Sequence, residues 1–531
     1  MPVPTDTPLF ADLRSKNVLH PEILNTITQD LKFEHMMPVQ AATVDDVLVK
    51  RSDCLVQART GTGKTLAFLL PTIQSALNAR RVGDGTVSAL ILTPTRELAL
   101  QIAAEAKALT ARFPKLTVAT SIGGTNKDRE ARNLASTILV ATPGRLIDHM
   151  DEPHVRELLG GLQTLVLDEA DRMLDMGFLP SIKNILAQLP RKQDVPRHSM
   201  LFSATLGDQI DKVTHNILNP GYKFISTIPK GERQTHDRVP QFSLTVPTIS
   251  DVAPAMLSVV TNERKSAKEF KAIVFATTAY MAEFYAHILA KSANLPPTSA
   301  LHSRLSQAKR TKITNEFRSS HDAICVATDV IARGMDFPGV THVFQVGLPM
   351  DRESYVHRLG RTARAEADGR GVIILSEPEA FFLRLLKGID IQHYPDVPLA
   401  VEAVTDAVKD LDGKGKIYQS WLGYYKGSVK QLRWSTADLV RQANTFAIEG
   451  LGCPEVPPLE KSTVGKMGLK GVPGLVVVAN LPRDHHHGRG GGQPSASAGR
   501  QSNPAPDHGN RESGGRSRGG GGQRQRRGGS K

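Results

Sequence analysis

The residues best suited to chemistry lie in a glycine-rich loop, Gly61-Thr62-Gly63-Lys64-Thr65. The loop follows an apolar run that ends near Val56 and precedes an apolar helical stretch at 66–70. In that setting glycines let backbone N–H groups turn toward a phosphate at the positive end of a helix. Lys64 would then neutralise the β- and γ-phosphates of a nucleotide, and the Thr65 hydroxyl would ligate Mg²⁺. A chance glycine-rich turn is the alternative, and the flanking strand and helix argue against it.

A pair of carboxylates, Asp168 and Glu169, directly follows another apolar run at 165–167. Two acidic side chains at the carboxyl end of a strand suit the hydrolysis of a nucleotide. Asp168 would hold Mg²⁺, and Glu169 would orient and deprotonate the attacking water. Without the glycine-rich loop, a solvated acidic turn would be the better interpretation. With the loop, the pair predicts a nucleoside triphosphatase.

Short apolar runs alternate with helical patterns through most of the chain, which predicts parallel sheets covered by helices. The runs of the first set are 54–56, 89–92, 118–122, 138–140, 165–167 and 200–202. The runs of the second set are 272–275, 298–301, 324–326, 343–346 and 372–375. A polar, proline-bearing stretch near 228–238 separates the two sets. We therefore expect two α/β domains joined by a linker.

The pattern becomes helical beyond Pro398, with apolar residues at three-to-four spacing over 400–411 and 437–448. Ser435 and Asp438 match a capping box at the start of the second stretch. From residue 483 onward the chain has no aromatic residue and no Ile, Leu, Val or Met. Such a segment cannot form a core, and we expect it to be disordered.

The net charge of +13 favours a polyanionic partner. Residues 483–531 hold ten Lys or Arg and three Asp or Glu, so this segment carries +7 of that charge. The three cysteines lie far apart and match neither a disulfide framework nor a metal motif. No apolar run is long enough to span a bilayer, so we expect no membrane association. Residues 1–14 show neither an apolar signal core nor an Arg-rich amphipathic helix.

The sequence Asp168-Glu169-Ala170-Asp171 is the literal signature of the DEAD-box RNA helicases, and the chain resembles that family over residues 33–375. The resemblance implies an α/β fold of two tandem RecA-like parallel-sheet domains, followed by a helical extension and a disordered basic tail. It implies a monomeric ATP hydrolase that uses ATP and Mg²⁺ and acts on RNA. The predicted ATP contacts in the phosphate loop are Thr60, Gly61, Thr62, Gly63, Lys64 and Thr65.

Phe33 and Gln40 resemble the family's adenine-reading segment. A ring can stack on adenine, and a Gln amide can pair with its donor–acceptor edge. The family usually has glycine before the phenylalanine, and here that residue is Lys32. A farther aromatic residue is expected upstream, where Phe10 is the available candidate.

Three further segments of the first domain resemble the family's contacts to the RNA backbone, and each follows a strand. The predicted contacts are Pro94, Thr95, Arg96, Gly124, Thr142, Gly144 and Arg145. Arginines would pair with phosphates, and glycines would admit the backbone closely. Ser203 and Thr205 resemble the segment that couples hydrolysis to strand separation, with hydroxyls that would bind the Asp168–Asp171 segment.

The second domain resembles the other half of the site. Thr328 and Gly334 would contact RNA, and Asp336 would reach the ATP ribose. Arg361 and Arg364, one helical turn apart, would reach the γ-phosphate as arginine fingers. Phe275, His302, Gln307 and Arg310 fall where the family places further RNA contacts, and apolar packing or surface polarity explains each of them equally well.

Aromatic and basic residues interleave over 414–434, which contains both tryptophans. This pattern fits either an added RNA platform of stacked rings and cations or a small helical core with a basic exterior. The segments 333–338, 361–364 and 418–423 resemble those of fungal mitochondrial DEAD-box RNA chaperones. Members of that subfamily carry a helical extension and a basic tail and assist intron folding. That likeness implies the mitochondrial matrix, with the nucleus or cytoplasm as alternatives.

The expected activity is local RNA unwinding and remodelling, with an ATP-gated RNA clamp as the rival. We place an N-terminal flank at 1–30, an ATP-binding domain at 31–228, a linker at 229–240, a second helicase domain at 241–398, a helical extension at 399–482 and an Arg/Gly-rich tail at 483–531.

Overall fold

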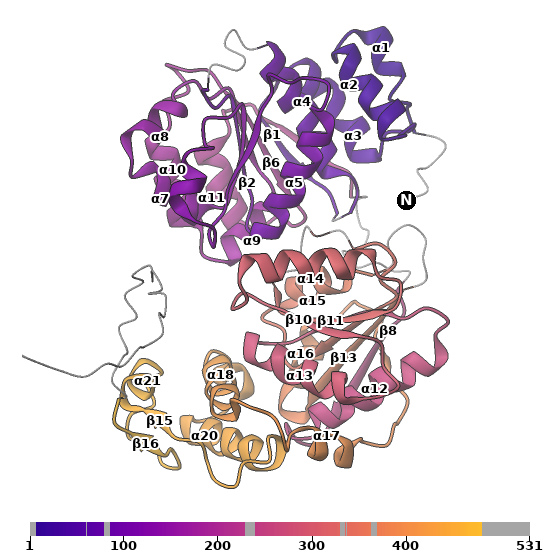
Figure 1. The fold of residues 1–531 in the computed structure, drawn as a ribbon, viewed down its shortest axis with the longest axis vertical. Helices are drawn as coiled ribbons and strands as arrows, with labels where there is room; N and C mark the ends of the chain where they lie inside the picture. The colour runs from indigo at the N-terminus through magenta and orange to yellow at the C-terminus, as the bar shows by residue number, and fades with distance from the viewer. Residues whose placement is uncertain are drawn as a thin grey trace, which may run out of the picture. The chain divides into compact units, whose positions relative to one another are not determined.

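Two parallel β-sheets with helices between their strands make up most of the chain (Figure 1). The structure, a computed structural model, describes residues 7–59, 61–78, 85–228, 239–329, 335, 337–362 and 369–480. The predicted tail at 483–531 lies outside these residues, as does most of the predicted linker. None of the described helices is long and apolar enough to cross a membrane.

The first sheet has the strand order β3-β4-β2-β5-β6-β1-β7, and all its neighbouring strands run parallel. Its strands are β1 (Cys54–Gln57), β2 (Ala89–Leu92), β3 (Val118–Ser121), β4 (Ile138–Ala141), β5 (Thr164–Leu167), β6 (His198–Ser203) and β7 (Lys223–Ser226). Alternate strand residues face opposite layers of helices. Val56 packs in the core that contains α4 (Lys64–Asn78) and α5 (Arg96–Leu109), whereas Leu55 packs in the core on the other side.

The second sheet has the order β10-β11-β9-β12-β13-β8-β14 and is also parallel throughout. Its strands are β8 (Gln241–Val246), β9 (Lys271–Phe275), β10 (Thr298–Leu301), β11 (Ala323–Ala327), β12 (His342–Val346), β13 (Arg370–Ser376) and β14 (Gln392–His393). The two sheets confirm the predicted fold class. The apolar runs predicted eleven of the fourteen strands of the two sheets and missed β7, β8 and β14. These lie at or next to a sheet edge, where a strand carries more polar residues.

The helices connect successive strands and cover both faces of each sheet. In the first half they are α1 (Asp12–Lys16), α2 (Pro21–Asn25), α3 (Pro38–Thr43), α4, α5, α6 (Lys127–Ala131), α7 (Pro143–Met150), α8 (Pro153–Leu158), α9 (Ala170–Asp175), α10 (Leu179–Gln188) and α11 (Asp208–Ile217). With the second sheet are α12 (Val252–Ser266), α13 (Ala279–Lys291), α14 (Gln307–Ser319), α15 (Arg352–Leu359) and α16 (Phe381–Leu385).

The extension is built from α17 (Val401–Ala407), α18 (Lys414–Lys426), α19 (Val429–Leu432), α20 (Thr436–Thr445) and α21 (Lys461–Lys466). It also contains two short paired strands, β15 (Leu459–Glu460) and β16 (Val477–Val478), which the helical prediction did not include. The predicted capping box is confirmed, since the Ser435 hydroxyl accepts from the Asp438 N–H at 3.0 Å.

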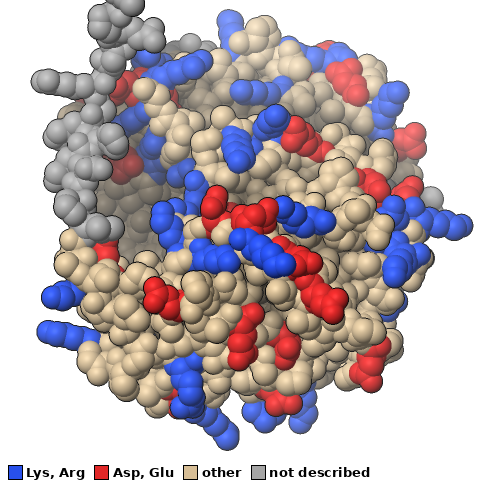
Figure 2. Space-filling model, turned by 60° about the horizontal axis from the view of Figure 1, so that its bottom comes forward, with Lys and Arg blue, Asp and Glu red and all other residues tan. Residues whose placement is uncertain are grey.

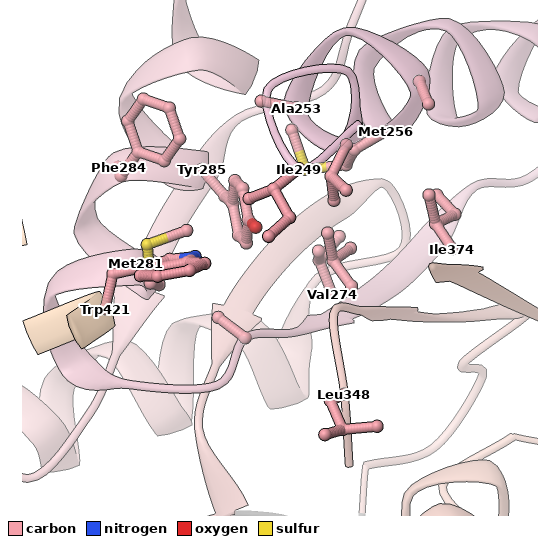
Figure 3. Close-up of a cluster of buried hydrophobic side chains, with 14 of the residues drawn as sticks. Ile249, Ala253, Met256, Val274, Met281, Phe284, Tyr285, Leu348, Ile374 and Trp421 are labelled. Atoms are coloured by element: carbon pink, nitrogen blue, oxygen red, sulfur yellow. The ribbon is translucent and has the colours of Figure 1, made fainter. Parts of the chain in front are cut away.

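The aromatic residues of α18 form part of the core rather than a stacking surface. Tyr418, Trp421 and Tyr425 are buried, and the Trp421 and Tyr425 rings stack with centroids 4.2 Å apart. Figure 3 shows Trp421 entering the apolar cluster beside Met281 of α13. Because these rings are covered, the structure favours the helical-core interpretation over an RNA platform for all three.

Candidate nucleotide and RNA site

The strand order divides the predicted residues of the first sheet into two neighbouring groups. β1, β6 and β5 lie side by side, and their carboxyl ends lead into the phosphate loop, Ser203 and Asp168-Glu169. β2, β4 and β3 form the other half, and their carboxyl ends lead into the three predicted RNA segments. Parallel strands present their carboxyl ends at one edge. β5 pairs with β2, so the nucleotide half and the RNA half meet there.

A buried ion pair joins the phosphate loop to the acidic segment. Lys64 Nζ lies 3.0 Å from Glu169 Oε1, and both side chains are almost fully covered. Burial opposes the charge on Lys64, but the nearby carboxylates of Glu169, Asp168 and Asp171 outweigh it and raise the pKa of Lys64. Glu169 has a left-handed backbone with φ +52°, a conformation that costs energy for a residue with a side chain. That backbone aims the carboxylate at the phosphate loop.

Asp168 has the properties of a cation ligand. It is buried, and within the described parts of the chain its Oδ1 atom has no hydrogen-bond partner. Burial, together with the neighbouring Glu169 carboxylate, raises the pKa of Asp168 to about 7. A divalent cation would stabilise the ionised form. No group of three or more acidic, His or Cys ligands occurs among the described residues. Mg²⁺ takes few protein ligands and completes its shell with phosphates and water, so Asp168 and the Thr65 hydroxyl would be enough to hold it.

Gln40 is fixed against the phosphate loop. Its Oε1 accepts from the Met37 N–H at 2.8 Å, and its Nε2 donates to the Gly63 carbonyl at 3.1 Å. Gly63 has φ +87°, and a Cβ on it would lie 2.4 Å from Gln40 Nε2. The loop therefore needs glycine at 63 for two reasons, its backbone conformation and the close approach of Gln40.

The aromatic candidates for adenine stacking differ in exposure. Phe33 is 48% exposed, so it is accessible to a ligand. Phe10 is 1% exposed and packs in the core, so the structure excludes it as a stacking residue. Lys32 has φ +56°, which explains the family's usual glycine at that position.

The coupling segment contacts the acidic segment through one of its two hydroxyls. The Thr205 N–H and hydroxyl donate to Asp171 Oδ2 at 3.2 and 2.9 Å. The Ser203 hydroxyl instead donates to the Thr205 carbonyl at 2.7 Å. Ser203 therefore shapes the turn, and Thr205 makes the contact expected of both.

In the RNA half, Arg96 lies directly against the glycine pair that follows β3. A Cβ on Gly124 would lie 2.4 Å from Arg96 Nη1, and Gly124 itself has φ +86°. Thr95 caps α5 by accepting from the Leu98 N–H at 3.3 Å, while Pro94 is buried. The predicted contacts Arg96 and Gly124 thus share one surface.

The segment after β4 places Arg145 beside the same glycine turn. The Arg145 guanidinium contacts Glu130 and donates to the Thr125 carbonyl. Thr142 is buried at the start of α7, whereas Gly144 is exposed, and a Cβ on it would have no neighbour within 4 Å. Nothing in the sequence pattern marked Glu130, whose partners lie up to 19 residues away.

Several predicted contacts of the second sheet are occupied within the protein. Gln307 Nε2 and Arg310 Nη2 donate to the two carboxylate oxygens of Glu97 in α5, at 3.1 and 2.5 Å. His302 is buried, and burial lowers its pKa to about 4. Phe275 is a core residue. These four side chains pack or pair internally, and their contact with RNA stays a prediction.

Arg361 does not lie on the helix that the sequence suggested. α15 ends at Leu359, and Arg361 follows it, 1% exposed, with Nη1 donating to the Met335 carbonyl at 2.5 Å. The argument that Arg361 shares a helical face with Arg364 is therefore wrong. Thr328 is half-buried after β11. Thr60, Gly334, Asp336 and Arg364 lie outside the described residues.

Arg358, which is buried, and Asp329, which is half-buried after β11, form an ion pair, and the sequence gave neither residue an individual role. Arg358 Nε and Nη2 donate to the two Asp329 carboxylate oxygens at 2.7 and 3.0 Å. The Arg172 guanidinium of α9 donates to the Asp329 carbonyl at 3.3 Å. Asp329 thus connects the residues that follow β11 with α15 and with the helix that carries Asp171.

Two family models match the chain. One, described as DEAD/DEAH box helicase, matches residues 37–213, and the other, helicase conserved C-terminal domain, matches residues 253–366. The chain is 45% identical over 482 residues to the ATP-dependent RNA helicase MSS116, mitochondrial, of Phaeosphaeria nodorum, which covers 88% of this chain and 86% of that relative. It is 40% identical over 458 residues to DEAD-box ATP-dependent RNA helicase 26 of Oryza sativa subsp. japonica, covering 84% and 83%.

Solved structures give the same result. The structure of Mss116p bound to single-stranded RNA and AMP-PNP matches with a TM-score of 0.77 at 29% identity, covering 90% of this chain and 98% of that one. The structure of Dbp5 of S. cerevisiae bound to RNA and ADP BeF3 matches with a TM-score of 0.60 at 25% identity, covering 72% and 95%.

Proposed function

The chain belongs to the DEAD-box family of ATP-dependent RNA helicases, and on that premise we propose which residues carry the reaction and where it is used. The ATP-binding domain spans 31–228, and the second domain spans 241–398. Lys64, Asp168 and Glu169 form the hydrolytic centre, with Gln40 and Phe33 selecting adenine. The protein acts as an RNA chaperone that unwinds short duplexes locally.

The buried Lys64–Glu169 pair is the observation that carries this assignment. A triphosphate in the loop competes with Glu169 for the Lys64 ammonium. The Glu169 carboxylate then becomes available to accept a proton from the attacking water. Mg²⁺ held by Asp168 and Thr65 would neutralise charge on the phosphates. The Lys64 ammonium and the left-handed backbone at Glu169 together set the direction in which the base points.

The contact between the two halves of the sheet supports control of hydrolysis by RNA. Thr205 binds Asp171, two residues beyond the base, and the β5–β2 pairing joins the acidic segment to the strand that precedes Arg96. RNA on Arg96 and Arg145 therefore acts on an element shared with the nucleotide half. If ATP and RNA favour the same arrangement, each must strengthen the binding of the other.

The partner is RNA, gripped along one strand through phosphates and 2′-hydroxyl groups, which is how RNA is distinguished from DNA. On the face drawn in Figure 2, Lys and Arg side chains are interspersed with Asp and Glu. Much of the net positive charge instead belongs to residues 483–531. We assign this basic segment to sequence-tolerant tethering of RNA.

The names of two fungal relatives include the word mitochondrial, and on this likeness we place the protein in the mitochondrial matrix. Its substrates there are structured intron RNAs that need local unwinding to fold. The protein works as a monomer, because one chain supplies both predicted halves of the ATP site.

Two assays on the purified protein test the proposal. ATPase activity should rise with RNA and not with DNA of the same sequence, and short RNA duplexes should be separated in the presence of ATP. Equal stimulation by DNA would refute the RNA assignment. RNA-stimulated hydrolysis without any strand separation would identify an ATP-gated clamp instead.

A further inference from the structure

A buried carboxylate lies between the two RNA segments that follow β3 and β4. Glu130, in the short helix α6, is 8% exposed. Its Oε1 accepts from the Ile122 N–H at 2.6 Å, directly before the Gly123-Gly124 turn. Its Oε2 accepts from the Arg145 guanidinium and lies 3.1 Å from His149 Nε2. One side chain therefore ties together the glycine turn, Arg145 and α7.

The Arg145 guanidinium is held in one orientation by these contacts. Its Nη1 atom contacts Glu130, and both Nη atoms lie within hydrogen-bond distance of the Thr125 carbonyl. An arginine side chain that is free in solution loses considerable rotamer entropy when it binds a phosphate. Glu130 and Thr125 already restrict the Arg145 side chain, so Arg145 loses less rotamer entropy when it binds a phosphate.

We propose that Glu130 is a positioning residue for RNA, which fixes Arg145 and the 122–125 turn as one rigid unit against the RNA backbone. The inference rests on the proposed RNA role of Arg145. Glu130 does not itself touch RNA, because a carboxylate would repel a phosphate. Its effect passes through Arg145 and the Ile122 N–H.

Charge alone and the positioning of Arg145 predict opposite changes in RNA affinity when Glu130 is replaced by a neutral residue. Glu130→Gln removes one negative charge beside a phosphate-binding surface, and charge alone would make RNA bind more tightly. The substituted amide oxygen can still accept from the Ile122 N–H, but it no longer pairs with the guanidinium as a carboxylate does. If Glu130 positions Arg145, RNA binding becomes weaker in spite of the more favourable charge.

The experiment measures the RNA concentration that half-saturates ATPase activity in the full chain, together with direct binding of a fluorescent single-stranded RNA. The variants are Glu130→Gln, Arg145→Ala and the double variant. Glu152→Gln is the matched control, because Glu152 is a partly exposed carboxylate that pairs, at 3.3 Å, with Lys127 of α6, the helix that also carries Glu130. Thermal unfolding of each variant reports any loss of folding.

Glu130→Gln should raise the half-saturating RNA concentration about tenfold, the size expected for one charge-assisted contact. It should raise that concentration more than it lowers kcat at saturating RNA. In the Arg145→Ala background the same substitution should add little, because the two residues act through one contact. Glu152→Gln should bind RNA as the natural chain does.

Unchanged or tighter RNA binding by Glu130→Gln would overturn the inference, as would a full additional loss in the double variant. Arg145→Ala separates this outcome from failure of the proposed function. That variant should weaken RNA binding and lower the slope of log affinity against log salt by about 0.7. If Arg145→Ala binds RNA normally, the RNA role of Arg145 itself is wrong.

Discussion

The two halves of the first sheet differ in how far they cover the predicted site residues at their shared edge. The nucleotide half buries charge, since Lys64, Asp168 and Glu169 are almost completely covered. The RNA half leaves Gly124 and Gly144 exposed, and its Arg145 side chain contacts the buried Glu130. Chemistry on a phosphate benefits from a dry site in which charges act strongly. Binding of a long polyanion requires an accessible surface with charges held in place.

Both halves nevertheless share one local feature, a glycine with a positive φ packed against a polar side chain. Gly63 and Gly124 each have a positive φ near +87°, and a Cβ on either would lie 2.4 Å from the polar end of a neighbouring side chain. The neighbour is Gln40 in the nucleotide half and Arg96 in the RNA half. In each half a glycine thus lies against a side chain to which we assign recognition, which gives a matched pair of substitutions.

The largest effect is expected from Glu169→Gln. Removing the base should lower ATP turnover by about 100-fold or more, while the variant still binds ATP and RNA. Single-turnover hydrolysis and equilibrium binding of both ligands measure this. Loss of RNA binding in the same variant would show that the two halves are not separable, and turnover at the natural rate would remove Glu169 from its role.

Gly63→Ala should weaken ATP binding about tenfold or more, because the added methyl group displaces Gln40 and strains a left-handed backbone. Binding of a fluorescent ATP analogue measures it, and RNA binding without nucleotide should stay near the natural value. Gly177→Ala is the control, since Gly177 has φ +77° and no neighbour within 4 Å of a Cβ. If Gly177→Ala weakens ATP binding as much as Gly63→Ala does, backbone strain alone explains the result, and displacement of Gln40 is not needed.

Gly124→Ala should raise the half-saturating RNA concentration severalfold, up to about tenfold, through the displaced Arg96 guanidinium. ATP affinity measured without RNA should change little. The result is read from RNA titrations of ATPase activity beside the same Gly177→Ala control. A loss of ATP affinity as large as the loss of RNA affinity would contradict the division into two halves.

The smallest expected effect is a change in stability on substitution of Lys32, which precedes Phe33 in the nucleotide half. Lys32→Gly should increase the free energy of unfolding by about 1 kcal/mol or less, because glycine adopts φ +56° without strain but has a more disordered unfolded state. Urea unfolding measures the change. Lys32→Ala, which keeps the strain, should not stabilise the protein; equal stabilisation by both variants would exclude backbone strain as the cause.

The sequence by itself determined the parts of the site whose geometry is local. The phosphate loop and the Asp168-Glu169 pair each follow a strand end directly, so neighbouring residues predict both the backbone and the chemistry. The central strands were predictable for the same kind of reason, because strands covered on both faces are continuous apolar runs. The edge strand β7 lacks that signal, because it is largely exposed.

The tertiary structure decided which of the predicted side chains are buried or paired within the protein and which are exposed to a ligand. Arg310 binds Glu97, 213 residues away, and Tyr424 of the extension donates to the Leu348 carbonyl at 2.6 Å. Trp421 fills a core instead of facing RNA, and Arg361 follows the end of a helix instead of lying on it. Glu130 gained its role only when folding brought Ile122, Arg145 and His149 around it. Burial and pairing depend on contacts between residues far apart in the sequence, and a local pattern of residue types does not predict such contacts.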